Sequence, residues 1–264
     1  MRRFTILALA AALASALFAI PVFAANGGAD AEITVVHGIP GDALGLDKEL
    51  PVDVCLSDGS DLLGSVPFMG TNAGDPLAVP AGTYSVEILL DETPATHCEG
   101  TAVLAADLTV ESGGRYTAIA HLTEGLAPGA ADLLDLGIDL TVIENDFSRI
   151  GEWRDRVTLG HFADAPMVDV YQGPAKGMDN KFMRELLADV PNGAAASADF
   201  EFGRRLFGLA ISPSEGPGEI AVGPARLWLA PKAATFVFAV GSLTEGEGSP
   251  FGLGSFDLIT YTQR

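Results

Sequence analysis

The sequence predicts an all-β protein built from two tandem antiparallel β-sandwich domains. Short apolar, β-branched runs are separated by turn residues throughout, and glycine and proline are abundant, at 31 and 16 of 264 residues. The pattern of the first half also returns about 120 residues later, and this internal repeat sets the unit that folds. Because the repeated unit is as large as a domain, the chain is a tandem pair and not a solenoid.

The strands of the first domain are expected where apolar runs lie between turn signals. These runs are 33–37, 52–56, 84–89, 104–110, 116–122 and 138–143. Turns are expected at Asp58-Gly59, at Pro80-Ala81-Gly82 and at Gly113-Gly114. In the run 84–89, large apolar residues alternate with small or polar ones, so one face of that strand should be buried. About seven short strands at such spacing are typical of a sandwich.

The second domain follows in step. Its runs are 157–162, 168–171, 206–211, 225–229, 236–241 and 256–261. Two short motifs recur between the halves, Leu122-Thr123-Glu124-Gly125 as Leu243-Thr244-Glu245-Gly246 and Val66-Pro67 as Val190-Pro191. The expected organisation is therefore a first domain over 25–145, a charged linker over 146–156 and a second domain over 157–264.

Insertions distinguish the two domains. The first has extra residues between Ile39 and Pro51, and the second has them over 176–188. In the second insertion Asp179 is expected to cap a short helix. That helix would carry four apolar side chains on one side, namely Phe182, Met183, Leu186 and Leu187.

Residues 1–24 have the pattern of a secretory signal peptide. Arg2 and Arg3 precede an apolar core over 6–20, and small residues around Ala24 offer a cleavage site. A membrane anchor is the alternative, which Pro21 and the small-residue exit disfavour. No cysteine follows the apolar core, which argues against a lipid anchor. We expect the mature protein to be secreted, extracellular or periplasmic, with no membrane insertion after cleavage.

The chain is strongly acidic. Its formal net charge is -20, and loss of Arg2 and Arg3 with the leader makes it -22. Such a surface repels nucleic acid and anionic lipid, so neither is expected as a partner. It leaves weak cation binding open, as well as an envelope protein or a glycan as a partner.

Cys55 and Cys98 are the two cysteines of the chain, and both lie in the first domain. In an exported protein an even pair indicates a disulfide bond. A metal or redox role would need closer spacing or more ligands. The second domain has Tyr171 where the first has Cys55, so it is expected to rely on packing.

His37 and His161 occupy equivalent places in the repeat, as do Asp53 and Asp169. One hypothesis is a polar pair or metal-ligand set in each domain. A histidine and one carboxylate are too few for zinc, which takes at least three protein ligands at catalytic sites. The alternative, which we favour, is a structural histidine that hydrogen-bonds a neighbouring carboxylate or backbone group at the end of the first strand.

No other constellation predicts catalysis or a cofactor. Calcium could be held by acidic loops, but without an EF-hand or similar repeat; the candidates are Asp42, Asp47, Asp132, Asp135, Asn145 and Asp146. The sequence has no Gly-x-Ser-x-Gly elbow and no activated cysteine. His97, beside Cys98, and His121, at a strand end, remain as unassigned histidines. We therefore expect neither a catalytic residue nor a bound cofactor or metal.

The ordered motifs resemble the DUF4397 family. The first domain carries them as His37, Pro40, Pro51-Val52-Asp53-Val54, Pro80-Ala81-Gly82-Thr83-Tyr84 and Tyr116. The second keeps His161, Asp164, Pro166 and Val168-Asp169-Val170-Tyr171, but has Gly203-Arg204-Arg205-Leu206-Phe207 in place of the proline-containing turn. The resemblance implies two tandem copies with an immunoglobulin-like or transthyretin-like fold, and it implies no particular activity.

The sequence thus favours an exported, non-enzymatic protein of structural, adhesive or ligand-presenting role. The first alternative is a carbohydrate- or peptide-binding module, which would show clustered exposed aromatic residues; Trp153, Trp228 and Phe251 are the candidates. The second alternative is a hydrolase with an unrecognised site, which would show a deep pocket with several perturbed titratable groups.

Overall fold

The computed structural model describes residues 28–264 apart from 45, 48, 50, 92–95, 101, 124–136, 175–182, 215, 217–219 and 243–255. The expected signal peptide lies outside the described residues. Those described form sixteen β-strands and one short 3-10 helix, η1 (Gly41–Leu44), which confirms the all-β fold class. None of the helical structure among them is long and apolar enough to cross a membrane.

The first unit is a sandwich of two four-stranded sheets. Its strands are β1 (Ala31–His37), β2 (Val52–Leu56), β3 (Asp61–Val66), β4 (Leu77–Val79), β5 (Gly82–Leu90), β6 (Ala102–Val110), β7 (Arg115–Leu122) and β8 (Ile138–Glu144). Sheet A has the order β4-β1-β7-β8, and sheet B the order β3-β2-β5-β6. All neighbours are antiparallel except β1 and β7, which run parallel.

The second unit repeats this topology strand for strand. Its strands are β9 (Arg154–Asp164), β10 (Val168–Pro174), β11 (Arg184–Val190), β12 (Ala194–Glu201), β13 (Gly203–Ile211), β14 (Val222–Leu229), β15 (Ala233–Ser242) and β16 (Asp257–Gln263). Sheet C has the order β12-β9-β15-β16, and sheet D the order β11-β10-β13-β14. The parallel pair also recurs, because β9 runs parallel to β15. The two units are therefore tandem domains of one architecture.

Each sandwich has its own apolar core. In the first unit, Ile33 on β1 and Ala118 on β7 pack in one cluster with Val54 and Val86 from sheet B. In the second unit, Val157 on β9 occupies the matching position in a larger cluster that includes residues of sheet D. Strands of sheets B and D alternate between buried and exposed residues where only one face is covered, as β6 and β14 show.

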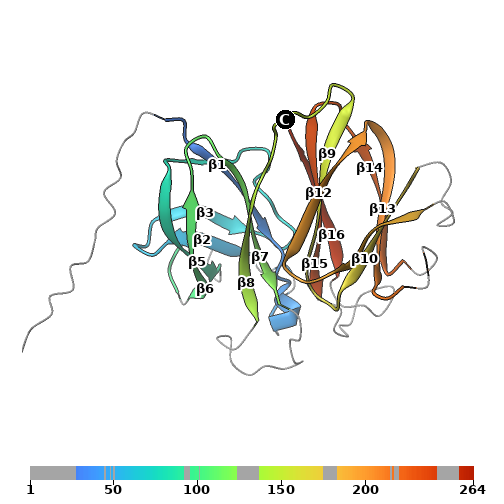
Figure 1. The fold of residues 1–264 in the computed structure, drawn as a ribbon. Coiled ribbons are helices and arrows are strands. Elements are labelled where there is room, and N and C mark those ends of the chain that lie inside the picture. The colour runs from blue at the N-terminus through green and yellow to red at the C-terminus, as the bar shows by residue number, and fades with distance from the viewer. Residues whose placement is uncertain are drawn as a thin grey trace, which may run out of the picture.

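Sheets A and C are buried on both faces because they pack against each other. We call this contact the seam. Val36 and Ile119 of sheet A form one cluster there with Phe162, Phe236 and Phe238 of sheet C. Figure 1 shows the resulting order of layers across the molecule, B, A, C and D. Double-sided burial explains why β7 and β15 show no alternation of buried and exposed residues.

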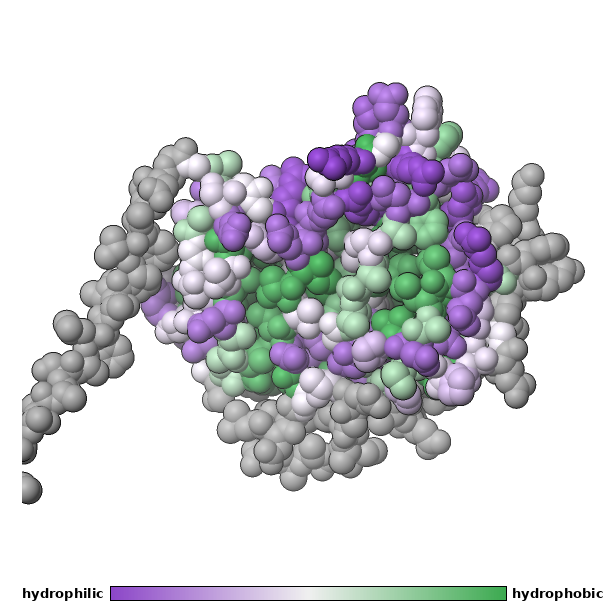
Figure 2. Space-filling view, in the orientation of Figure 1, coloured by the Kyte–Doolittle hydropathy of each residue, from purple (hydrophilic) through white to green (hydrophobic). Residues whose placement is uncertain are grey.

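Polar contacts join the two units across the same seam. The Tyr261 hydroxyl lies 2.8 Å from Thr117 Oγ1, and the Gln263 amide donates to Thr34 Oγ1 at 2.5 Å. The Asn192 amide donates both to Leu122 O of the first unit, at 2.9 Å, and to Ala163 O of the second, at 2.6 Å. The two sandwiches thus share a partly polar, mostly aromatic interface. Figure 2 shows hydrophilic residues gathered along one rim above the hydrophobic middle of both units.

The structure corrects three expectations. Each unit has eight described strands, because β3 and β4, with their counterparts β11 and β12, were not expected. The prediction of a short helix over 176–188 is wrong for its second half, since Leu186 and Leu187 lie on strand β11. Residues 175–182 lie outside the described part. Finally, β9 begins at Arg154, inside the segment expected to be a linker.

Candidate functional site

The buried aspartate of the Val-Asp-Val motif satisfies backbone groups that the sheet leaves unpaired. Asp53, on β2, is 2% exposed. The pairing of β2 with β3 shifts register beside it, and Ser65 takes a left-handed backbone conformation with φ of 56°. One carboxylate oxygen accepts the Ser65 N–H at 2.8 Å, and the other accepts the Cys98 N–H at 3.2 Å. A bulge frees backbone groups from the ladder, so a carboxylate at this position compensates for it.

Asp169 does the same in the second unit. It accepts the N–H of Asp189, whose φ is 52°, at 2.9 Å, and the N–H of Ser214 at 3.1 Å. The register shifts between β10 and β11 match those of the first unit. Burial acts to raise the pKa of Asp169, but these hydrogen bonds outweigh burial, and the pKa lies below its usual value. The repeated aspartate is thus part of how each unit folds.

The repeated histidines contact backbone carbonyls. His37 Nδ1 donates to Val66 O at 3.0 Å, and burial lowers the pKa of this imidazole from 6.5 to about 4. His161 Nε2 lies 3.2 Å from Ala165 O and 3.1 Å from Pro166 O. Neither joins a group of three metal-ligating side chains in the part of the chain that the structure describes. His37 ends β1 as expected, whereas β9 continues past His161 to Asp164.

The two units link the same pair of positions in different ways. Cys55 on β2 and Cys98 form the expected disulfide bond, with Cα atoms 5.8 Å apart. In the second unit the equivalent residues are Tyr171 and Ser214, and the tyrosine hydroxyl forms a short hydrogen bond with the serine hydroxyl. The expectation that packing alone replaces the disulfide is therefore incomplete. A polar contact bridges the same strand and loop.

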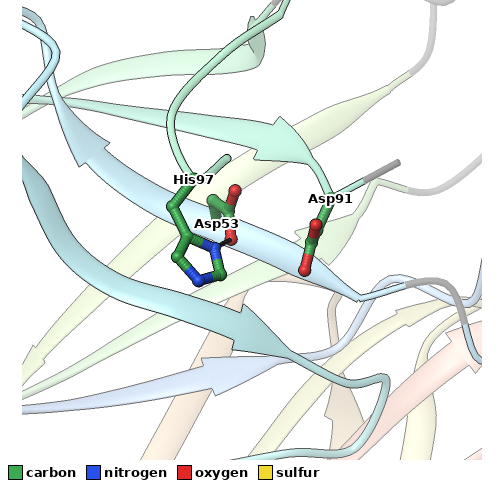
Figure 3. Close-up of side chains that lie close together, drawn as sticks. All are labelled: Asp53, Asp91 and His97. Carbon is green, nitrogen blue, oxygen red and sulfur yellow. Dashed lines mark hydrogen bonds and ion pairs between the residues drawn. The ribbon is translucent and has the colours of Figure 1, made fainter. Parts of the chain in front are cut away.

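A histidine and a second acidic residue turn the Asp53 region into a candidate functional site. His97, which sequence reasoning left unassigned, lies with its Nδ1 2.9 Å from Asp53 Oδ1. Asp91 follows directly after β5, and Figure 3 shows it beside the other two side chains. Ligand atoms of the three residues all lie within 4.8 Å of one another. The hydrogen bond with Asp53 is the main cause that raises the pKa of His97.

Asp91 is the unusual member of this group. It is 4% exposed, and neither carboxylate oxygen has a hydrogen-bond partner among the described residues. Sequence reasoning missed it because it follows an ordinary apolar strand without a motif. For His97 a signal existed: its neighbour Cys98 is bonded to Cys55, only two residues from Asp53. A disulfide therefore predicts that His97 and Asp53 lie close together.

The structure does not bring together those calcium candidates that it describes. Asp132 and Asp135 lie outside the described residues. Asp47 accepts the N–H of Glu49 at 3.1 Å, a local turn contact, and Asp42 lies in η1. Asn145 and Asp146 have partners of their own; the Asn145 amide, for example, donates to Thr117 Oγ1 at 3.0 Å. Among the described residues none of these belongs to a three-ligand group.

A polar cleft opens in the second unit, between β9 and β12 of sheet C and β10, β11 and β13 of sheet D. Its volume is about 470 Å³. Three arginines line it, Arg154, Arg184 and Arg205, and none forms an ion pair with a described residue. Asp199 also lines the cleft, where it pairs with Arg156 at 2.8 Å. Glu201 lines the cleft as well, so three guanidinium groups and two carboxylates meet there.

Exposed aromatic residues lie next in sequence to this cleft. Trp153 precedes Arg154, is 66% exposed, and its ring centroid lies 5.6 Å from that of Phe202. Trp228, 62% exposed, lies under the guanidinium of Arg204 at 5.6 Å. Phe251, the third aromatic candidate, lies outside the described residues. Trp153 and Phe202 therefore form an aromatic pair at the surface.

Fold and site together define a disulfide-bonded all-β protein of two sandwiches. The chain belongs to the DUF4397 family, a domain of unknown function, whose sequence pattern matches residues 31–171. The match is single, so it does not confirm two copies of the family, and the likeness of the units rests on their topology. A comparison with curated proteins finds no match.

Similarity to solved structures is low. The Bacillus anthracis TIE protein matches with 10% identity and a TM-score of 0.23, over 80% of this chain and 33% of its own. This chain therefore spans about a third of that protein's length. A DUF3823 family protein from Bacteroides ovatus matches with 11% identity and a TM-score of 0.17, over 76% of this chain and all of its own.

Proposed function

We propose that this protein is an exported, non-enzymatic module of the cell envelope with a structural or adhesive role. The observation that carries the proposal is the seam. A module that holds partners at a fixed spacing needs domains that do not move independently, and interfaces between domains restrict motion when they are apolar and well packed. Phe162, Phe236 and Phe238 are each at most 1% exposed there.

The disulfide supports export as the setting of this role. Structural disulfides persist in oxidising compartments and are rare in the cytosol. The pairing of Cys55 with Cys98 leaves no free cysteine among the described residues. The strongly acidic composition, with 35 acidic against 15 basic residues, suits a protein that must stay dispersed in an external medium.

The test is a deletion of the gene in the source organism, followed by fractionation and a surface-attachment assay. The protein should be recovered outside the cytoplasm, and its loss should reduce attachment or envelope integrity. Complementation with Phe162→Ala, which loosens the seam, should restore less attachment or envelope integrity than complementation with the wild-type gene. The control Val142→Ala, at an exposed position, should restore them fully. Recovery in the cytosol with two free thiols, or a deletion whose only effect is on turnover of an external substrate, would overturn the proposal.

A second candidate function is binding of an acidic saccharide or peptide in the arginine-lined cleft. Arginine recognises carboxylates through paired hydrogen bonds, and Arg154, Arg184 and Arg205 have no ion-pair partner among the described residues. The Trp153–Phe202 pair offers an apolar surface next in sequence to them. A few convergent polar groups beside aromatic side chains are typical of ligand sites.

This second candidate is tested on an array of glycans and peptides. Uronate- or sialate-bearing glycans, or carboxylate-rich peptides, should be retained over neutral ones. Arg205→Gln should abolish retention, whereas Arg204→Gln, which removes a guanidinium that lies over Trp228 and does not line the cleft, should leave it unchanged. Equal retention of neutral and acidic ligands would contradict this function.

A further inference from the structure

We propose that Asp53, Asp91 and His97 bind one divalent metal ion of the zinc class on the first unit. The proposal concerns the disulfide-linked side of sheet B and is independent of the envelope role argued above. All three residues are held by regular structure or by the disulfide: Asp53 lies on β2, Asp91 directly follows β5, and His97 precedes Cys98.

The distances suit a single ion. Zinc binds imidazole nitrogen and carboxylate oxygen at about 2.0–2.2 Å in tetrahedral geometry, so the ligand atoms of one ion lie about 3.4 Å apart. Here the ligand atoms lie within 4.8 Å of one another. Binding therefore requires the widest pair of ligand atoms to approach each other by up to about 1.4 Å. Rotation of the partly exposed His97 ring can supply part of this movement.

The buried carboxylate of Asp91 is the observation that points to a cation. Burial of a charge is unfavourable unless the charge is paired or coordinates a metal. Both Asp91 oxygens are buried without a hydrogen-bond partner among the described residues, and the Asp53 carboxylate lies close by. In the described part of the chain, the cationic group that pairs with Asp53 is His97 itself. A metal ion would compensate both carboxylates at once.

The ligand types favour zinc over calcium. Calcium takes six to eight oxygen ligands, whereas imidazole suits zinc and neighbouring transition metals. Two carboxylates and one imidazole leave a fourth position for water, the arrangement of three protein ligands known for open zinc sites. Both cysteines are in the disulfide, so thiolate does not take part.

The second unit provides an internal comparison. It keeps the aspartate, as Asp169, but the residue after the fifth strand is Ser212 and the residue before Ser214 is Pro213. Neither can replace a carboxylate or an imidazole as a metal ligand. Asp169 accepts hydrogen bonds from backbone N–H groups and serine hydroxyls without a second metal ligand beside it, so one ion per chain is expected.

The experiment is calorimetric titration of zinc chloride into the metal-free, disulfide-bonded protein, with melting curves taken in parallel. We expect one site per chain and a melting temperature that rises with zinc, since a ligand that binds only the folded state stabilises it. His97→Gln should raise the dissociation constant for zinc at least about tenfold. Asp107→Asn, at an exposed carboxylate on β6, is the matched control and should bind as wild type does.

Asp91→Asn tests the site even if the His97 variant changes the stability of the fold. It removes a buried, uncompensated charge, so it should raise the melting temperature without metal and abolish the zinc-dependent rise. Zinc binding that is absent from wild type, or unchanged in Asp91→Asn and His97→Gln, would overturn the site. Calcium binding tighter than zinc binding would overturn the choice of metal class.

Discussion

Acid should destabilise the fold through His37. This side chain is 2% exposed, its Nδ1 donates to Val66 O, and burial lowers its pKa to about 4. In the unfolded chain the pKa returns to about 6.5. Between these values the unfolded state binds a proton that the folded state does not, so stability is complete above about pH 6.5 and falls as the pH falls toward 4.

The size of this effect follows from the two pKa values. A change from 6.5 to about 4 corresponds to about 3 kcal/mol between the protonation states. Between pH 7.5 and pH 4.5 the linkage should therefore remove about 2.5 kcal/mol of unfolding free energy. Other groups titrate in the same range; His121, for example, is also buried and has a lowered pKa. The contribution of His37 must therefore be measured as a difference between variants.

The variant is His37→Gln, whose amide can still donate to Val66 O but cannot take up a proton. Urea unfolding at pH 7.5 and 4.5, in a chelating buffer, should show an acid loss smaller than that of wild type by about 2.5 kcal/mol. The control is His97→Gln. The hydrogen bond with Asp53 raises the pKa of His97, so its contribution is present at low pH and is lost as pH rises. Removal of the His97 imidazole should therefore enlarge the decrease in unfolding free energy between pH 7.5 and pH 4.5. Equal acid losses in wild type and His37→Gln would refute the reasoning.

Three further predictions concern stability. Replacing Cys55 and Cys98 together by alanine removes a link across a sequence separation of 43 and should cost about 4 kcal/mol in denaturant unfolding; an unchanged midpoint would contradict this. Tyr171→Phe removes the hydrogen bond to Ser214 and should cost about 1 kcal/mol, measured in the same way, and a loss as large as that of the disulfide variant would count against it. Phe162→Ala opens a cavity at the seam and should cost about 3–5 kcal/mol. A thermal melt that shifts by less than a degree would show that the seam is not packed.

The inner strands and one edge strand of each sheet could be predicted from sequence, and the other edge strand of each sheet could not. The mostly apolar runs at 116–122 and 236–241 predict β7 and β15, which are buried on both faces. The four missed strands, β3, β4, β11 and β12, all lie at sheet edges. There one face is exposed and the residues are mixed, so periodicity is weak. The misses coincide in the two units because the same positions are edges in both.

The candidate site was only half visible in the sequence. The Val-Asp-Val repeat indicated Asp53 and Asp169, but it paired them with His37 and His161, whose hydrogen bonds go to backbone carbonyls. The actual neighbour of Asp53 is His97, which lies 44 residues away in the chain. That contact depends on where a loop after β5 returns to sheet B. Local periodicity does not encode such a path, and the signal for it was the pairing of Cys55 with Cys98.

The position of the first strand in each sandwich governs the order in which the chain can fold. β1 lies between β4 and β7, and β9 lies between β12 and β15. Their parallel partners begin only at Arg115 and Ala233, so neither inner sheet can close until nearly all of its unit has been synthesised. Pairings so distant in sequence slow folding and keep apolar strands open for longer. Both cysteines precede β7, so in the first unit the covalent link on sheet B can form before sheet A is complete.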